Sequence, residues 1–300
     1  MSSSRKVFVT NSDVLNLPYN YVPTEWVCIV FVALFGVSCT IHIVQAIRFR
    51  LWWLFPTAVL CGLLEVIGWS GRLWSSKNPF LQTPFLMQIA TTIVAPTPLV
   101  AAIFIILGRI TRRLGPQYCR LTPRQYTTVF LSFDIVALVV QSIGGGIASG
   151  TQPDLGGHIA LGGIVLQLVV LLFYTALSAE FLIRFNLDRP SRHSGKKGAD
   201  PRSTVDMPMA YMLIGMSAMT IFLLIRSIYR TIELSGGWNG KVISTQWLFN
   251  VFDGAMIVLA IFTLNFFHPG VFLRGKDGLE GLEADMKGEG EGDNDSQKNV

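Results

Sequence analysis

The sequence Arg226-Ser-Ile-Tyr-Arg-Thr-Ile-Glu233 places three charged side chains at the end of a strongly apolar stretch. Arg226, Arg230 and Glu233 are spaced i, i+4 and i+7, so they share one face of a helix. A charge deep in lipid costs about 2.5–3.5 kcal/mol on insertion scales, so such side chains normally face a protein interior and pair with other helices. The alternative is that the arginines extend into the outer headgroups. The stretch therefore predicts a polar site inside a membrane-spanning bundle.

Three carboxylates interrupt other apolar runs that are long enough to span a bilayer. They are Glu65, Asp134 and Asp253. Arg72 lies two turns after Glu65 on the same helix face. Together with Glu233 these carboxylates number four, against three arginines, so one carboxylate is left over. We expect the carboxylate without a partner to receive a cationic amine headgroup or a proton.

The composition excludes a soluble globular domain, because 51% of the 300 residues are hydrophobic and only 14% are charged. Apolar windows of about 20 residues, the length that crosses a bilayer as a helix, recur along the chain. They lie near 26–47, 52–71, 85–107, 127–148, 158–182, 208–229 and 244–266. The sequence therefore predicts an all-α, polytopic membrane protein, with a single bundle of seven transmembrane helices over 25–272.

Lysines and arginines are unevenly distributed between the two sides of this predicted bundle. One set of alternate connections holds 17 of them and the other set holds 6. The richer set consists of 48–50, 108–125, 183–207 and 267–300. Because cytoplasmic loops carry an excess of these residues, the rule places the N-terminus outside and the C-terminus in the cytoplasm. We expect 1–24 to be a poorly ordered extracellular arm and 273–300 to be a disordered cytoplasmic tail rich in Gly, Asp and Glu.

The net charge of +5 does not indicate nucleic-acid binding. The basic residues concentrate in short connections beside the predicted spans, where they set topology and contact anionic lipids. The expected partners are therefore membrane lipids and an amphipathic small molecule, with no nucleic acid.

Small and polar residues mark three further positions inside the spans. Ala95-Pro-Thr-Pro98 removes two backbone donors and predicts a kink. Gly144-Gly-Gly146 either lets another helix approach closely or loosens the end of its own helix. Gln141 and Gln167 are amides in apolar runs, which form interhelical hydrogen bonds more often than they contact a substrate.

Motifs for catalysis and for other seven-helix proteins are absent or incomplete. The run from Gly270 to Asp277 resembles a phosphate-binding loop but ends in Asp instead of Ser or Thr. No acidic residue precedes Arg109 and no lysine lies inside a span, which argues against rhodopsin-like receptors. The four histidines do not converge on a zinc site. We therefore expect no enzymatic activity, no cofactor and no bound metal.

Taken together, the charged and glycine-bearing stretches resemble the fungal lipid-translocating exporter family, the aminocholesterol-resistance-like or RTA-like seven-span proteins, over nearly all of 20–272. The matching positions in the early spans are Glu65, Gly68, Arg72, Gln88, Ala95-Pro96, Ala101-Ala102 and Leu107-Gly-Arg109. Those in the middle spans are Asp134, Gln141, Gly144-Gly-Gly146, Gly163 and Gln167. The most specific are Arg226-Ser-x-Tyr-Arg230 with Glu233, Phe252-Asp253, Asn265 and His268-Pro-Gly270. The chain departs from the residues common in that family at Phe104, Gln246 and Asn250.

The resemblance implies a fungal membrane protein, in the plasma membrane, that is linked to stress response and to export of, or drug resistance toward, amphiphiles. Family members are connected to sphingoid bases, sterol-like toxins or porphyrin. The first hypothesis is therefore a translocator, exporter or resistance factor for amphipathic lipids or lipid-like toxins. The second hypothesis is a seven-helix receptor or sensor of lipid or stress signals. Its cytoplasmic connections 108–125 and 183–207 would recruit protein partners.

The predicted site has two groups of residues. The candidates for substrate binding or proton coupling are Asp253, Asp134, Glu65, Gln141 and Gln167. The candidates for a charge network are Arg72, Arg226, Arg230 and Glu233.

Asp253 is the most specific of these predictions. It lies about nine residues into the last span, near the bilayer midplane, whereas Arg226 lies about 28 Å from the inner start of its helix and so near the outer rim. An extended arginine would meet this carboxylate only if a helix shifted or water entered. We therefore expect Glu65 and Glu233 to pair with the arginines, and Asp253 to be the substrate or proton site.

Overall fold

The computed structural model of the protein describes residues 17, 19–114, 118–120, 122–150, 152–187, 206–237 and 240–272. These residues form helices and connecting turns, with no strand among them. Seven helical segments are long and apolar enough to cross a membrane. They are Glu25–Phe49, Trp52–Lys77, Gln82–Leu114, Thr127–Ala148, Pro153–Asn186, Met207–Ser235 and Gln246–Phe272. The predicted all-α, seven-span, multi-pass membrane protein is confirmed.

Four spans are single helices and three are built from several pieces. The single helices are α2 (Glu25–Phe49), α6 (Pro123–Ala148), α7 (Pro153–Asn186) and α8 (Met207–Ser235). The second span consists of the 3-10 helix η1 (Trp52–Leu54), the π-helix η2 (Phe55–Val59) and α3 (Leu60–Lys77). The third consists of α4 (Gln82–Val94) and α5 (Pro96–Leu114). The last consists of α9 (Gln246–Leu248), the π-helix η4 (Phe249–Ala255), α10 (Met256–Phe266) and α11 (Pro269–Phe272).

The third span breaks at Ala95, between α4 and α5. Ala95 still donates its N–H to the carbonyl of Thr91, at 2.8 Å. Pro96 has no N–H, so the carbonyl of Thr92, four residues earlier, loses its intrahelical donor. The break predicted from the two prolines is present, and it frees the Thr92 carbonyl to accept from another helix.

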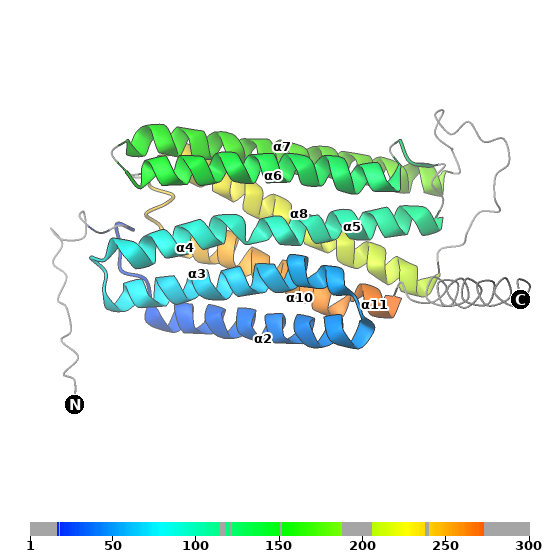
Figure 1. The fold of residues 1–300 in the computed structure, drawn as a ribbon, viewed down its shortest axis with the longest axis horizontal. Helices are drawn as coiled ribbons and strands as arrows, with labels where there is room; N and C mark the ends of the chain where they lie inside the picture. The colour runs from blue at the N-terminus through cyan, green and yellow to red at the C-terminus, as the bar shows by residue number, and fades with distance from the viewer. Residues whose placement is uncertain are drawn as a thin grey trace, which may run out of the picture.

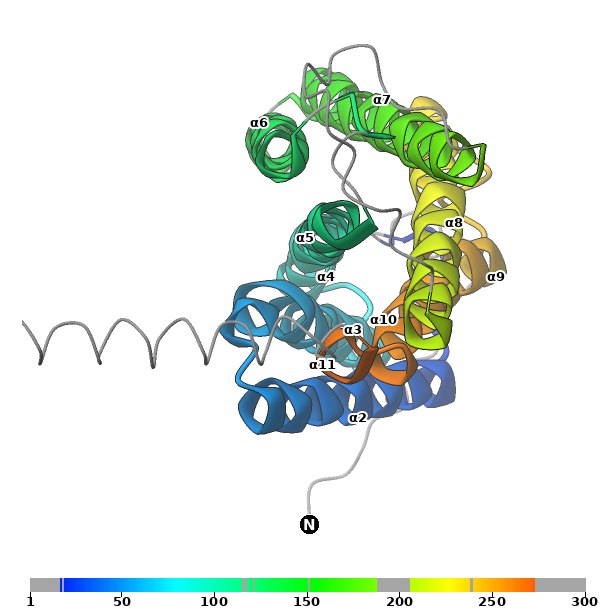
Figure 2. The same cartoon turned by 90° about the vertical axis from the view of Figure 1, so that its right-hand side faces the viewer.

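The spans run side by side along one long axis (Figure 1). Seen along that axis, α6 and α7 lie on one side of the bundle and α2, α3 and α10 on the other, with α5 between them (Figure 2). α8 crosses the bundle obliquely and packs against both α7 and α10. It therefore joins the two groups of helices. We call the end at which α2 begins and α8 ends the N-terminal end of the bundle.

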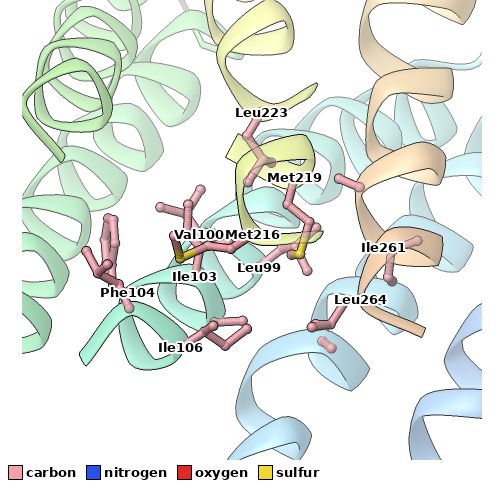
Figure 3. Packing of buried hydrophobic residues seen from close by; sticks show 14 of the residues in the cluster. Leu99, Val100, Ile103, Phe104, Ile106, Met216, Met219, Leu223, Ile261 and Leu264 are labelled. Atoms are coloured by element: carbon pink, nitrogen blue, oxygen red, sulfur yellow. The ribbon is translucent and has the colours of Figure 1, made fainter. Parts of the chain in front are cut away.

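The apolar core runs through both halves of the bundle, from Phe31 of α2 and Trp69 of α3 to the half away from the N-terminal end. It includes Leu99 and Ile103 of α5, Met216 and Met219 of α8, and Leu264 of α10 (Figure 3). Methionine is unbranched and fills irregular gaps, which suits an obliquely crossing helix. The buried arginines of α3 and α8, Arg72, Arg226 and Arg230, lie beside the part of this core that is in the N-terminal half.

α6 and α7 approach each other through small residues. A Cβ atom at Gly144 would collide with the backbone of Ala160, whereas nothing lies within 4 Å of a Cβ atom at Gly145 or Gly146. Gly144 is thus the residue of the triple glycine that permits close helix packing. This decides between the two interpretations that the sequence left open.

The described part of the N-terminal arm packs against the bundle. Leu17 and Tyr19 are buried, and Tyr19 Oη lies 3.4 Å from Ser75 Oγ on α3. The expected poor order is therefore wrong for this segment, because its apolar and aromatic side chains cover the helix ends. The remainder of the arm, most of the 183–207 connection and the 273–300 tail lie outside the described residues. Which side of the membrane each end faces remains a prediction.

Candidate functional site

Four charged side chains from α8 and the last span meet in the N-terminal half of the bundle. We call Arg226, Arg230, Glu233 and Asp253 the charge cluster; each is at most 5% exposed. Arg230 donates from Nε to Asp253 Oδ1 at 2.7 Å and from Nη2 to Asp253 Oδ2 at 3.0 Å. Its Nη1 donates to Glu233 Oε2 at 2.8 Å. Arg226 Nε lies 3.0 Å from Asp253 Oδ1. Two cations and two anions therefore balance one another in a buried setting.

The break in the third span supplies acceptors to both arginines. Arg226 Nη2 donates to the carbonyl of Thr92 at 2.7 Å, which is the carbonyl that Pro96 frees. Arg230 Nη2 also donates to Thr92 Oγ1, at 3.1 Å. Hydrogen bonds from charged groups stabilise by about 1.5–3 kcal/mol each. The carbonyl that the proline break leaves without a helical donor is thus satisfied by Arg226 of α8.

The expectation that Asp253 lacks an arginine partner is wrong. α8 continues to Ser235 instead of ending near 229. Arg226 therefore lies about 14 Å, and Arg230 about 8 Å, below that end of α8. The last span begins at Gln246, which puts Asp253 about 10 Å below the same end of the bundle. Its depth falls between those of the two arginines, so neither a helix shift nor water is needed.

The π-helix η4 shapes the last span at the level of the charge cluster. A π-helix has a wider turn than an α-helix, so it changes which side chains share a face, and such segments are frequent at functional sites. Phe249 and Asp253 are both buried within it. The ring of Phe249 lies 5.1 Å from the guanidinium carbon of Arg230, which also binds Asp253. η4 therefore presents an aromatic ring and a carboxylate to the same arginine.

Arg72, on α3, stands apart from the charge cluster. It is 1% exposed and has no carboxylate within ion-pair distance among the described residues. Its guanidinium carbon lies 4.4 Å from the ring centroid of Phe249, 5.2 Å from that of Tyr19 and 5.4 Å from that of Tyr21. Nη2 donates to the hydroxyl of Tyr21, whereas Nε has no hydrogen-bond partner in the described part of the chain. Aromatic faces, not an anion, therefore hold this cation.

The two tyrosines do not supply the missing negative charge. Burial raises the pKa of Tyr19 to about 12, although the nearby Arg72 opposes this in part. Burial likewise raises the pKa of Tyr21 above its ordinary value. Both phenols stay protonated at physiological pH, so the charge of Arg72 is uncompensated within the described residues.

A cavity of about 560 Å³ lies beside these groups. Its polar wall includes Tyr19, Tyr21, Arg72, Gln88, Arg230 and Glu233. Its apolar wall includes Leu86, Ile89 and Ile93 of α4, with Ala148 of α6 and Ala160 of α7. Leu86 and Ser149 line the cavity and are themselves exposed, so it reaches the surface between α4 and α6. A mostly apolar space with a few fixed polar groups is the usual form of a small-molecule site.

The residues predicted to bind substrate do not line this cavity. Arg230 lines the cavity, and Asp253 binds Arg230 without lining the cavity itself. Glu65 is buried about 18 Å below the end of α3 at Lys77, deeper than either arginine of the charge cluster. It forms no ion pair among the described residues, and its Oε1 has no hydrogen-bond partner there. The expectation that Glu65 pairs with an arginine is therefore wrong, whereas Glu233 does pair with Arg230.

Asp134 is isolated from both the cavity and the charge cluster. It is 1% exposed on α6, and neither carboxylate oxygen has a hydrogen-bond partner in the described part of the chain. One turn away, Phe130 packs against the rings of Phe104 and Tyr174. Asp134 therefore occupies an apolar setting between α6 and its neighbours.

Gln141 and Gln167 form a polar chain across three helices. Gln141 Nε2 donates to Gln167 Oε1 at 3.1 Å, and Gln167 Nε2 donates to Thr97 Oγ1 at 3.1 Å. The two amides share a space of about 10 Å³ with Arg226 and Arg230, roughly the size of one water molecule. They contact other helices, which is the first of the two roles that the sequence allowed.

The comparison with protein families decides the affiliation of the chain. The family described as "RTA1 like protein" matches residues 58–276. The chain belongs to the RTA1-like family. The resemblance stated from the sequence is therefore confirmed, and the match spans all of the site except the part of the cavity wall before the first span, which includes Tyr19 and Tyr21.

Named relatives of this RTA1-like chain come from Saccharomyces cerevisiae. The sphingoid long-chain base transporter RSB1 of strain EC1118 is 28% identical over 284 residues, covering 85% of this chain and 74% of that protein. Protein RTA1 is 28% identical over 200 residues, covering 66% and 60%. Protoporphyrin uptake protein 1 is 26% identical over 214 residues, covering 70% and 67%. No solved structure matches the chain.

Sequence reasoning missed the aromatic part of this RTA1-like site. Neither Tyr21 nor Phe249 is among the residues that the sequence analysis predicts for the site. The Tyr19-Asn-Tyr21 repeat before the first span is a sequence signal for an aromatic pair, and a turn at Asn20, whose φ is 58°, brings the two ring centroids within 5.8 Å of each other. Nothing in the sequence marks the π-helix that brings Phe249 to Arg72.

Proposed function

We propose that the protein is a translocator for amphipathic lipids or lipid-like toxins in the plasma membrane. The observation that carries this proposal is the cavity between α4 and α6, with its charged wall and its apolar wall. An amphipathic molecule needs both kinds of surface at once, a polar contact for its headgroup and an apolar one for its chain.

The position of the opening supports transport of a membrane-borne molecule. Gln82, Leu86 and Ser149 line the cavity and are exposed, so it opens near the N-terminal end of the bundle, between the start of α4 and the end of α6, where a membrane-borne molecule can reach it. The relatives named as a sphingoid long-chain base transporter and a protoporphyrin uptake protein support the same class of activity. We infer transport, not catalysis, as the role of this site.

The charge cluster contributes by holding the polar wall of the cavity in place. Arg230 and Glu233 line the cavity while Asp253 holds Arg230 from behind. Under this proposal Asp253 acts on the substrate through Arg230. A direct proton-coupling role for Asp253 would require the ion pair to open during the cycle.

Purified protein in liposomes without ATP tests the proposal, with a fluorescent sphingoid base and a fluorescent fatty acid assayed in parallel. We expect at least one label to cross the bilayer faster than in protein-free liposomes. Transfer of both labels at the protein-free rate would overturn the translocator and favour the receptor or sensor hypothesis.

Two matched tryptophan variants tie transport to the cavity. Ile89→Trp places a large side chain on the apolar wall, so it should slow transfer. Ile135→Trp places the same side chain on an exposed face of α6, so it should leave transfer unchanged. Equal transfer by the two variants would separate the activity from the cavity.

A further inference from the structure

The uncompensated charge at the cavity is positive. Arg72 lines the cavity without a carboxylate partner, whereas the arginine of the charge cluster that lines it is already paired. We propose that Arg72 binds the carboxylate or phosphate group of an amphipathic ligand whose apolar chain lies along α4. This inference rests on the proposed function, because it names the headgroup that the same cavity takes.

Arg72 has donors to spare. Its Nε makes no hydrogen bond within the described residues, and one Nη donates to Tyr21. A guanidinium presents its N–H groups as a planar fork that matches two oxygens of a carboxylate or phosphate. The Tyr21 hydroxyl accepts from Arg72, so its own hydrogen can be donated to a ligand oxygen. Both side chains line the cavity, which lets them act on one headgroup.

A cationic headgroup would find fewer partners in the same place. Glu233 is the one carboxylate in the cavity wall among the described residues. Its Oε1 accepts from Tyr229 at 3.0 Å and its Oε2 accepts from Arg230 at 2.8 Å. An amine would have to compete with a tyrosine and an arginine that are already bound. The carboxylate left over in the sequence count therefore does not face the cavity, and the unmatched group there is Arg72.

The apolar wall of the cavity offers a surface for the hydrocarbon chain of the ligand. Leu86, Ile89 and Ile93 are spaced i, i+3 and i+7, so they form one stripe along α4. The stripe runs from the exposed Leu86 toward the interior of the bundle. A single hydrocarbon chain would lie along it while the anionic group meets Arg72.

Competition binding to the full chain in zwitterionic nanodiscs tests the headgroup. The probes are dodecanoate, dodecyl phosphate and dodecylamine, which share one chain and differ in headgroup charge. We expect the two anions to bind at least about tenfold more tightly than the amine, since a hydrogen bond to a charged group is worth about ten- to hundredfold in affinity. If the amine binds more tightly than the anions to the wild-type protein, the inference is overturned. The translocator proposal is not affected by that result.

Acetate and inorganic phosphate distinguish a free anion from an amphiphile. We expect neither to compete at the concentration where its dodecyl counterpart does. Equal competition would assign Arg72 to a soluble anion and overturn the amphiphilic ligand.

Arg72→Gln should remove the preference for anions by about ten- to hundredfold. Lys77→Gln is the matched control, because Lys77 is an exposed cation on the same helix that pairs with Glu25; it should keep the preference. If Arg72→Gln does not fold, Arg72→Lys retains the charge and should still prefer the anions. An amine preference in Arg72→Lys, or an unchanged preference in folded Arg72→Gln, contradicts the assignment.

Discussion

Arg230 and Asp253 are joined by two parallel hydrogen bonds, Nε to Oδ1 at 2.7 Å and Nη2 to Oδ2 at 3.0 Å. Two bonds between planar groups fix orientation as well as distance. The pair links α8 to the π-helix of the last span, and Arg226 approaches the same carboxylate. Asp253 is therefore the residue on which two buried cations depend.

Asp253→Asn should greatly reduce the amount of folded protein. The amide removes the negative charge between two buried arginines, and breaking a buried ion pair from one side costs about 3–5 kcal/mol. The melting temperature of the detergent-solubilised protein, followed by size-exclusion chromatography, measures this loss. Asp206→Asn is the control, because Asp206 is an exposed partner of Arg113 at 3.5 Å; surface pairs contribute about 0–1 kcal/mol. Equal melting temperatures would mean that the charge cluster does not stabilise the bundle.

Asp134→Asn should leave the folded amount near that of the wild type. Asp134 is as deeply buried as Asp253, yet its oxygens have no hydrogen-bond partner in the described part of the chain. The change to an amide of the same shape therefore breaks no contact. The same chromatographic assay checks this, and a loss as large as that of Asp253→Asn would show that Asp134 has a partner.

Phe249→Leu should destabilise the cavity wall, because it removes the aromatic contacts of both Arg72 and Arg230. The ring lies 4.4 Å from Arg72 and 5.1 Å from Arg230, and each buried cation–π contact is worth about 0.5–2 kcal/mol. We expect a lower melting temperature and weaker binding of amphiphiles. Phe266→Leu, at an exposed aromatic of α10, should change neither quantity. A similar response of the two variants would remove the special role of Phe249.

Gly144→Ala should destabilise the bundle while Gly146→Ala should not. A methyl group at Gly144 meets the backbone of Ala160, so α6 and α7 must move apart at a cost of about 1–3 kcal/mol. The same methyl group at Gly146 enters open space, and replacing a helical glycine by alanine gains about 0.5–1 kcal/mol. Thermal unfolding of the two variants should therefore shift in opposite directions. A shift in the same direction would contradict the close packing.

The spans and the charged face of α8 could be predicted from the sequence, because apolar length and helical periodicity are local properties. The pairing of Asp253 with the two arginines could not be predicted in this way. It depends on where α8 ends, and a difference of six residues there moves Arg226 by about 9 Å relative to the last span. The role of Phe249 depends on the π-helix, whose extra width follows from tertiary packing and not from residue type. Sequence patterns therefore identified the charges and the pairing of Glu233 with an arginine, but not the pairing of either arginine with Asp253.

The topology predicted from the distribution of lysine and arginine is tested with tags. A tag after Met1 should be accessible on intact cells, and a tag after Val300 only after permeabilisation. The same result would place the N-terminal end of the bundle, and the cavity with it, at the outer side of the membrane. A glycan on Asn294, which lies in an acceptor sequence on the predicted cytoplasmic tail, would overturn this orientation.

Thr92 links α4, which forms the apolar wall of the cavity, to the two arginines of the charge cluster. Its carbonyl accepts from Arg226 and its hydroxyl accepts from Arg230, while the same helix carries Ile89 and Ile93 along the cavity. The carbonyl lacks its donor within the helix because Pro96 has no N–H, so Arg226 takes over that role from across the bundle. Any displacement of α4 away from α8 would therefore break a hydrogen bond of each arginine at once. The side chains that hold α4 in place are thus the same cations that neutralise Asp253 and Glu233.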